Sequence, residues 1–255
     1  MVSHRLMLLR HTILLKVFGF VAVLLVTKTA IHHFELDFVA ISPLVTAFVG
    51  GVIFIIAIIL SDTLSDYKES EKIPSELAAS ILILYKDVRM TSTDNEKIST
   101  MRDRIRRLLT TINSNFKSNL WKQTDVNLAM DKIDEDIVSL AHKGTPPQFI
   151  VRLRNELANI DRISNRIETI KETTFIPAAY NVAQLAVGAA ILTLLFTNID
   201  RFIDGIIMTG VISLILISLI LLIKDMDDPF EVGKKTYADI DLSLMYKLEE
   251  RLKTL

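Results

Sequence analysis

The stretch PLVTAFVGGVIFIIAIIL, from Pro43 to Leu60, contains no charged residue. A helix that crosses a membrane needs about 20 predominantly apolar residues to span about 30 Å of hydrocarbon. Uncharged runs of this length are rare in soluble domains, so a buried core helix is the weaker interpretation. We therefore predict a membrane-spanning helix over residues 43–60.

Two further runs, residues 176–199 and 205–223, are also uncharged and predict two more spanning helices. A fourth run, Val17 to Thr27, is too short alone, but it reaches spanning length when extended back to Thr12. The extension includes Lys16, whose ammonium group can reach the interface while its stem stays apolar. A signal peptide is the alternative, but Lys28 falls where a small residue would be needed for cleavage. We favour a retained first helix.

The basic residues that flank the four predicted spans indicate the topology. Lysine and arginine collect on the cytoplasmic side of membrane proteins. The two loops on one side carry only Lys28 and Arg201, whereas the other side carries Arg5, Arg10, Lys16, Lys68, Lys72, Lys224, Lys234 and Lys235. We therefore expect an inner or plasma membrane protein with both termini in the cytoplasm. The expected segments are 1–61 and 176–224, each with two spans, and the cytoplasmic segments 62–175 and 225–255.

The composition of the 255 residues excludes several classes of protein. The net charge is −1, which gives no overall attraction to nucleic acid. The chain has no cysteine, so disulfides, thiolate metal sites and thiol catalysis are excluded. Hydrophobic residues make up 50% of the chain, which excludes a disordered protein.

The segment from Asp62 to Phe175 predicts helices throughout. Apolar residues recur there at spacings of three and four, a pattern typical of amphipathic helices that pack in a bundle or between subunits. Breaks are expected near residues 91–94, 121–124 and 143–147, and the second span is expected to run past Leu60 and to restart near Pro74. The apolar positions are Ile98, Met101, Ile105, Leu108, Ile112 and Phe116, then Val126, Met130, Ile133, Ile137 and Leu140, then Ile150, Leu153, Leu157, Ile160, Ile167 and Ile170.

The sequence offers little that predicts catalysis. It has no nucleotide-binding loop, no HExxH motif and no pattern of Ser, His and Asp that indicates a catalytic triad, so we expect no enzyme. The adjacent His32 and His33 would point to different helix faces, which disfavours joint metal ligation. The arginines between Arg102 and Arg107 are interpreted as an ion-paired helix face, because the acidic run Asp134–Asp136 offers them a partner.

The small residues of the second span allow two interpretations. Ala47, Gly50, Gly51 and Ala57 would let helices approach closely within a bundle. Alternatively, one such helix from each subunit of an oligomer lines a central pore, where an apolar ring can gate by dewetting. No charged residue lies in the middle of a span, which disfavours a proton relay or an ion-coupled transporter.

The acidic segment after the fourth span carries Asp225, Asp227 and Asp228, followed by Pro229 and Phe230. Several carboxylates in so short a stretch could hold calcium, but they lack the regular ligand spacing of a calcium-binding loop.

These features together resemble the bestrophins, and more closely their distant prokaryotic relatives, the bestrophin-like proteins. The resemblance covers nearly the whole chain. It rests on the order of spans and helical insert, on Asp66-Tyr67-Lys68-Glu69 with Pro74 after the second span, on Ile176-Pro177 and on the segment from Asp225 to Phe230. It implies an all-α homo-oligomer, with a pentamer favoured, in which a four-helix transmembrane domain and a helical cytoplasmic domain surround one ion pathway.

The resemblance also implies which residues line the narrow neck of that pathway. Counting back from Tyr67 places Phe54, Gly50 and Thr46 on the neck, where the family has bulky apolar residues at each level. Glycine and threonine would leave a wider or wetter constriction, and a shifted register with Phe48 and Val52 is the alternative. Calcium-binding bestrophins carry a longer acidic run after Pro-Phe-Gly than this chain does, so we expect no cofactor.

The expected function is therefore passive conduction of small inorganic ions through an oligomer in the lipid membrane. Glu35 and Asp37, near the outer mouth, would favour cations if they face the axis, and the arginines from Arg102 to Arg107, among them Arg106, would favour anions if they line the inner mouth. The alternative is a non-conducting membrane adaptor whose cytoplasmic helices, above all residues 150–170, bind a protein partner.

Overall fold

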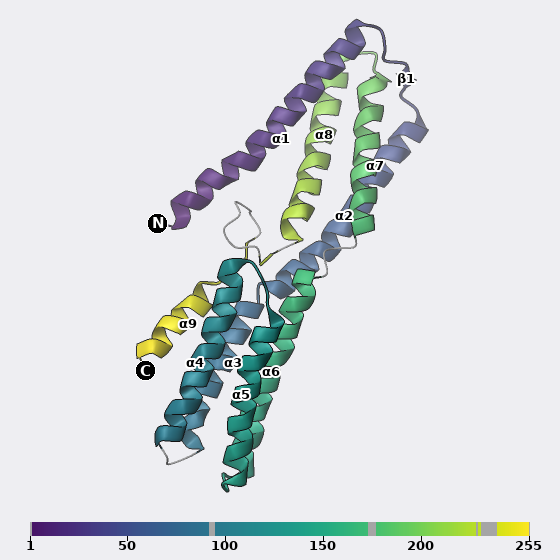
Figure 1. Ribbon diagram of the computed structural model, residues 1–255. Coiled ribbons are helices and arrows are strands. Elements are labelled where there is room, and N and C mark those ends of the chain that lie inside the picture. Colours follow the sequence, from purple (N-terminus) through teal and green to yellow (C-terminus); the bar gives the residue numbers. More distant parts are fainter. Residues whose placement is uncertain (1, 92–94, 173–176, 228, 231–238, 255) are drawn as a thin grey trace. The chain divides into compact units, whose positions relative to one another are not determined.

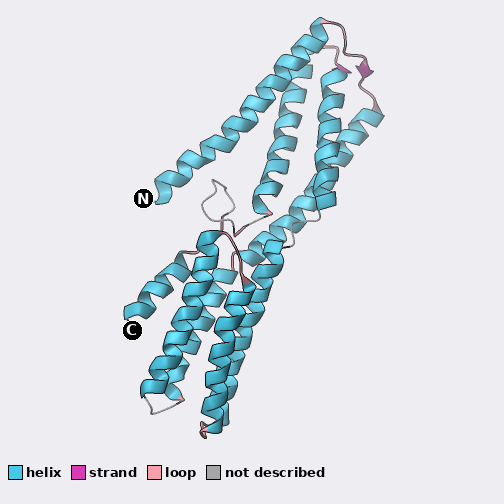
Figure 2. Ribbon diagram, in the orientation of Figure 1, coloured by secondary structure: helices cyan, strands magenta, loops and turns pink. Residues whose placement is uncertain are grey.

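The computed structural model describes residues 2–91, 95–172, 177–227, 229–230 and 239–254, and it is almost entirely helical (Figures 1 and 2). It divides into two compact units. The first comprises Met1–Asp66 and Thr174–Asp227, and the second is built mainly from Tyr67–Thr173 and Asp239–Leu255. The all-α fold expected from the sequence is confirmed.

The first unit contains the four apolar helices that the sequence predicts. They are α1 (Val2–His33), α2 (Pro43–Ser70), α7 (Pro177–Phe196) and α8 (Phe202–Met226). By length and composition α1, α2 and α8 can each cross a membrane, and the apolar part of α7 that the structure describes is a shorter stretch, Tyr180–Phe196. Helix α1 packs against α7 and α8, and α7 packs against α8.

Two short strands in the first unit are absent from the sequence prediction. Strand β1 (Val39–Ala40) pairs in parallel with β2 (Thr197–Asn198), with Val39 opposite Thr197. Each strand has only two residues, so neither produces the alternation that marks a strand in a sequence. The pairing joins the loop after α1 to the end of α7.

The second unit is a bundle of amphipathic helices. They are α3 (Ile73–Asp87), α4 (Asn95–Ser118), α5 (Gln123–His142), α6 (Pro147–Glu172) and α9 (Ser243–Thr254), and a short 3₁₀ helix, η1 (Val88–Met90), follows α3. Helix α6 packs against α3 and α5, α4 packs against α5, and α9 packs against α3 and α4.

The apolar positions predicted in the bundle form its core. All of them are buried except Ile98, Ile150 and Ile170, which are partly buried and pack against the same cluster. The helix boundaries also follow the expected signals, since Pro74 lies in the first turn of α3 and Pro147 begins α6. After α5 the chain turns at Gly144, whose φ of 85° suits a residue without a Cβ. Helix α9 was not predicted.

The buried aromatic residue Phe230 anchors the chain to this core. Phe230 is fully buried, and its ring stacks on Phe116 of α4 with centroids 5.6 Å apart. Phe116 in turn packs against Trp121 at 5.2 Å. Beside this aromatic group, the backbone N–H of Ile240 donates to the carbonyl of Pro229 at 3.0 Å. These contacts therefore fasten Pro229, Phe230 and Ile240 to the bundle.

A buried lysine, Lys28, links α1 to the end of α7 in the first unit. Lys28 of α1 is only 2% exposed, and its ammonium group donates to the carbonyl of Leu195 at 2.9 Å and to that of Thr197. Leu195 lies in the last turn of α7 and Thr197 directly follows the helix in β2. The C-terminal end of a helix has carbonyls without intrahelical donors, and the helix dipole favours a cation there. Lys28 of α1 thus caps the C-terminal end of α7.

We predict that Phe230→Ala destabilises the protein by about 3–5 kcal/mol, because it removes a fully buried ring and leaves a cavity beside Phe116. The measurement is thermal unfolding of the detergent-solubilised protein, followed by loss of helical circular dichroism. Leu128→Ala, at an exposed position of α5, is the control and should change stability by no more than about 0.5 kcal/mol. Equal effects of the two substitutions would contradict the anchoring role.

We predict that Lys28→Met lowers stability by about 1–3 kcal/mol, because buried carbonyls at the end of α7 lose their donor while the volume of the side chain is nearly kept. The same unfolding measurement checks it. Lys16→Met, on the exposed part of α1, removes the same charge and should have little effect. An unchanged melting temperature for Lys28→Met would mean that other donors, such as water, replace the ammonium group.

Candidate functional site

Helix α2 has one face in the core of the first unit and the opposite face uncovered. Val52, Ile56 and Ile59 are buried in a cluster with residues of α7 and α8, including Val187 and Leu216. The spacing of these α2 residues, four and three, defines one stripe of the helix. The residues on the other side are exposed, although nearly all of them are apolar or small.

The two registers proposed for the pore place different residues on the uncovered side. Phe54 is 66% exposed, and Gly50 and Thr46 are also exposed. In the alternative register, Phe48 is 39% exposed but Val52 is only 3% exposed and packs inside the unit. The residues of the first register therefore share an uncovered face, and those of the second do not.

The glycines of α2 face open space in the protomer. A Cβ atom built on Gly50 or Gly51 would meet no other atom within 4 Å. The protomer itself therefore imposes no steric demand for glycine at either position. Any such demand would have to come from whatever covers this face in the membrane.

Glu35 and Asp37, the predicted outer-mouth carboxylates, differ in their surroundings. Asp37 lies 2.7 Å from Nδ1 of His32, and the hydrogen bond with His32 holds the pKa of Asp37 below its ordinary value. The ring of His32 also stacks on Phe202 at 4.2 Å, which ties the loop to the start of α8. Glu35 is exposed and has a φ of 57°, so it forms the turn after α1.

Arg102 and Arg106, the predicted inner-mouth cations, converge on one aromatic ring of the second unit. Their guanidinium carbons lie 4.4 and 5.4 Å from the centroid of Tyr85. Arg106 also donates to the hydroxyl of Tyr85 at 2.7 Å and to the carbonyl of Leu252 at 2.8 Å. Arg106 thereby joins α3, α4 and α9, a structural role that the sequence did not reveal because its partners are distant in the chain.

The acidic segment after α8 is only partly described. Asp225 lies in the last turn of α8 and Asp227 follows the helix, and each interacts with neighbouring groups. Asp228 lies outside the described residues, whereas Pro229 and Phe230 are buried in the second unit. Over the ranges that the structure describes, no three His, Asp or Glu side chains are grouped so that they could hold a metal ion.

The chain has the fold of solved structures of a bacterial bestrophin homologue from Klebsiella pneumoniae. One point variant of that homologue matches with a TM-score of 0.78 and 12% identity over 93% of this chain and 99% of the other. The homologue solved by zinc phasing matches with a TM-score of 0.74 and 13% identity over 100% and 98%. A structure described as a point variant of a membrane protein matches with a TM-score of 0.79 and 14% identity over 94% and 97%.

No family model and no curated protein sequence matches the chain. The likeness is therefore one of architecture, and it extends from the first apolar helix to the last helix of the bundle. Together with four apolar helices in one unit, it identifies the chain as a membrane protein with the fold of the bacterial bestrophin homologues.

Proposed function

We propose that this protein is an oligomeric ion channel, with a pentamer favoured, in which α2 of each subunit lines a central pore for small inorganic ions. One observation carries the proposal. The face of α2 opposite the core is uncovered over the length of a membrane span, and it carries Phe54, Gly50 and Thr46. Copies of this face meeting around an axis would enclose a pathway, and the likeness to the bestrophin homologues supports that arrangement.

In this proposal Phe54 forms the narrowest apolar ring. A ring of phenylalanines can close a pore by excluding water and needs no charged group to do so. Gly50 and Thr46, at successive turns on the same face, would leave the pore wider and more polar on that side of the ring. The burial of Val52 in the protomer core supports the register with Phe54 rather than the one with Phe48 and Val52.

The proposed channel lies in an inner or plasma membrane with both termini in the cytoplasm, as the distribution of basic residues indicates. Glu35, exposed in the turn after α1, is then available at the outer mouth. Arg102 and Arg106 are held against Tyr85 in the bundle, so their charges act from fixed positions rather than from mobile side chains.

We predict that the purified protein, reconstituted in lipid vesicles or planar bilayers, conducts ions and that Phe54→Ala increases the current severalfold. The smaller side chain lets water enter the constriction, which lowers the barrier to ions. Phe20→Ala, at an exposed position of α1, is the matched control and should leave the current unchanged. A wild-type protein and a Phe54→Ala variant that both fail to conduct would sink the proposal.

A second prediction concerns the position of Gly50 in the proposed pore. Gly50→Leu should leave the helix as stable or more stable, by up to about 1 kcal/mol, because glycine is a poor helix former and the position is open in the protomer. The current should nevertheless fall severalfold, because a leucine ring narrows the pathway. Gly188→Leu in α7, where an added Cβ also meets nothing within 4 Å, is the control. An equal loss of current in both variants would argue against a pore at Gly50.

A further inference from the structure

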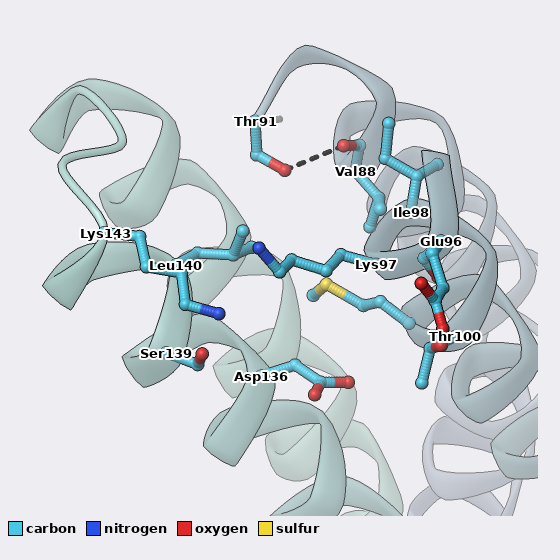
Figure 3. Close-up of a pocket in the computed structure, with 11 residues that line it drawn as sticks. Val88, Thr91, Glu96, Lys97, Ile98, Thr100, Asp136, Ser139, Leu140 and Lys143 are labelled. Atoms are coloured by element: carbon cyan, nitrogen blue, oxygen red, sulfur yellow. Dashed lines mark hydrogen bonds between the residues drawn. The ribbon is translucent and has the colours of Figure 1, made fainter. Parts of the chain in front are cut away.

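A cavity of about 320 Å³ lies in the second unit. It opens between η1 with the turn after it, the first turns of α4 and the last turns of α5 (Figure 3). Thr91 closes one end of it, where its hydroxyl donates to the carbonyl of Val88 at 2.7 Å. Its volume falls in the range of about 300–1,000 Å³ that is usual for small-molecule sites.

The wall of the cavity is apolar where it meets the bundle. Val88, Met101 and Leu140 line it, and all three are buried members of the core cluster. These side chains come from η1, α4 and α5, so the surface is held by three separate elements. Such a wall favours the apolar part of a ligand, because burying it removes hydrocarbon from water.

The carboxylate of Asp136 also lines the cavity, and one of its two oxygens has no hydrogen-bond donor among the described residues. Oδ1 of Asp136 lies 3.2 Å from Nη1 of Arg104, but Oδ2 is buried and has no hydrogen-bond donor in the described parts of the chain. The same Nη1 of Arg104 donates to the carbonyl of Lys132, so this arginine is shared. Burial raises the pKa of Asp136, and the charge of Arg104 only partly opposes that effect. A perturbed carboxyl in a pocket is a common feature of binding sites.

Two cations line the cavity from opposite sides. Lys97 belongs to the first turn of α4, and its side chain extends toward α5, as Figure 3 shows. Lys143 lies in the turn that follows α5. Asp136 projects from α5 toward α4 in the same view. Glu96, next to Lys97 in α4, also lines the cavity, which therefore presents both signs of charge beside an apolar wall.

We propose that this cavity binds a small zwitterion with an apolar side chain, such as an aliphatic amino acid. The ammonium group of the ligand pairs with Asp136, its carboxylate pairs with Lys97 and Lys143, and its side chain packs on Val88, Met101 and Leu140. A simple anion would supply no donor to Oδ2 of Asp136, and a simple cation would supply no acceptor to the two lysines. A ligand with both groups supplies both.

The test uses L-leucine as the probe, measured by isothermal titration calorimetry on the full-length protein in detergent. L-leucine methyl ester lacks the carboxylate, and 4-methylpentanoate lacks the ammonium group. We expect L-leucine to bind at least tenfold more tightly than either analogue. No heat of binding with L-leucine, or equal affinity for all three compounds, overturns the proposal. Conduction plays no part in the measurement, so its outcome is independent of the proposed channel function.

Asp136→Asn should weaken L-leucine binding at least tenfold, because the amide keeps the shape and loses the charge. Glu135→Gln is the matched control, since Glu135 is 75% exposed, lies 3.8 Å from the same Arg104 atom and does not line the cavity. If Asp136→Asn fails to fold by circular dichroism, Lys143→Gln takes its place with the same expected loss. Unchanged binding in the folded variant, or an equal loss in Glu135→Gln, contradicts the site.

Discussion

A helix that is apolar on every side has to be covered on every side, and α2 is such a helix over its membrane-spanning part. A protein core, lipid or a second copy can each provide the cover. The protomer covers only the stripe of Val52, Ile56 and Ile59. Residues of α7 and α8 supply the other side of the same cluster. What covers the remaining face determines whether the molecule encloses a pathway.

The last turn of α2 belongs to the second unit, where it is paired with α6. Arg166 of α6 donates to both carboxylate oxygens of Glu69, at 3.0 and 2.8 Å. These hydrogen bonds hold the pKa of Glu69 below its ordinary value and so favour its charged form. A bidentate arginine–carboxylate pair fixes direction as well as distance. It therefore adds a directional contact between α6 and the end of α2 to the apolar packing of Tyr67 in the same unit.

Sequence reasoning located most of the architecture because the dominant signals were local. Charge-free runs marked the spans, and the three-and-four spacing marked the core face of α4, α5 and α6. It missed α9, a helix of twelve residues, and the two-residue strands, whose pairing joins positions far apart in the chain. It could not choose between Phe54 and Val52, since both lie in an apolar run, and only the packing of α7 and α8 distinguishes their environments. The same limit applied to Arg106, whose partners lie on α3 and α9.

The hydrogen bonds from Lys28 to the end of α7 couple the length of α7 to the position of Lys28 in α1. Lys28 sits at a fixed height in α1, and the carbonyls that it reaches belong to Leu195 and Thr197. Each residue of a helix turns the chain by about 100°, so deleting one residue upstream in α7 would swing these carbonyls away from the ammonium group. Insertions or deletions in α7 during evolution should therefore come in near-whole turns or be matched by a compensating change in α1.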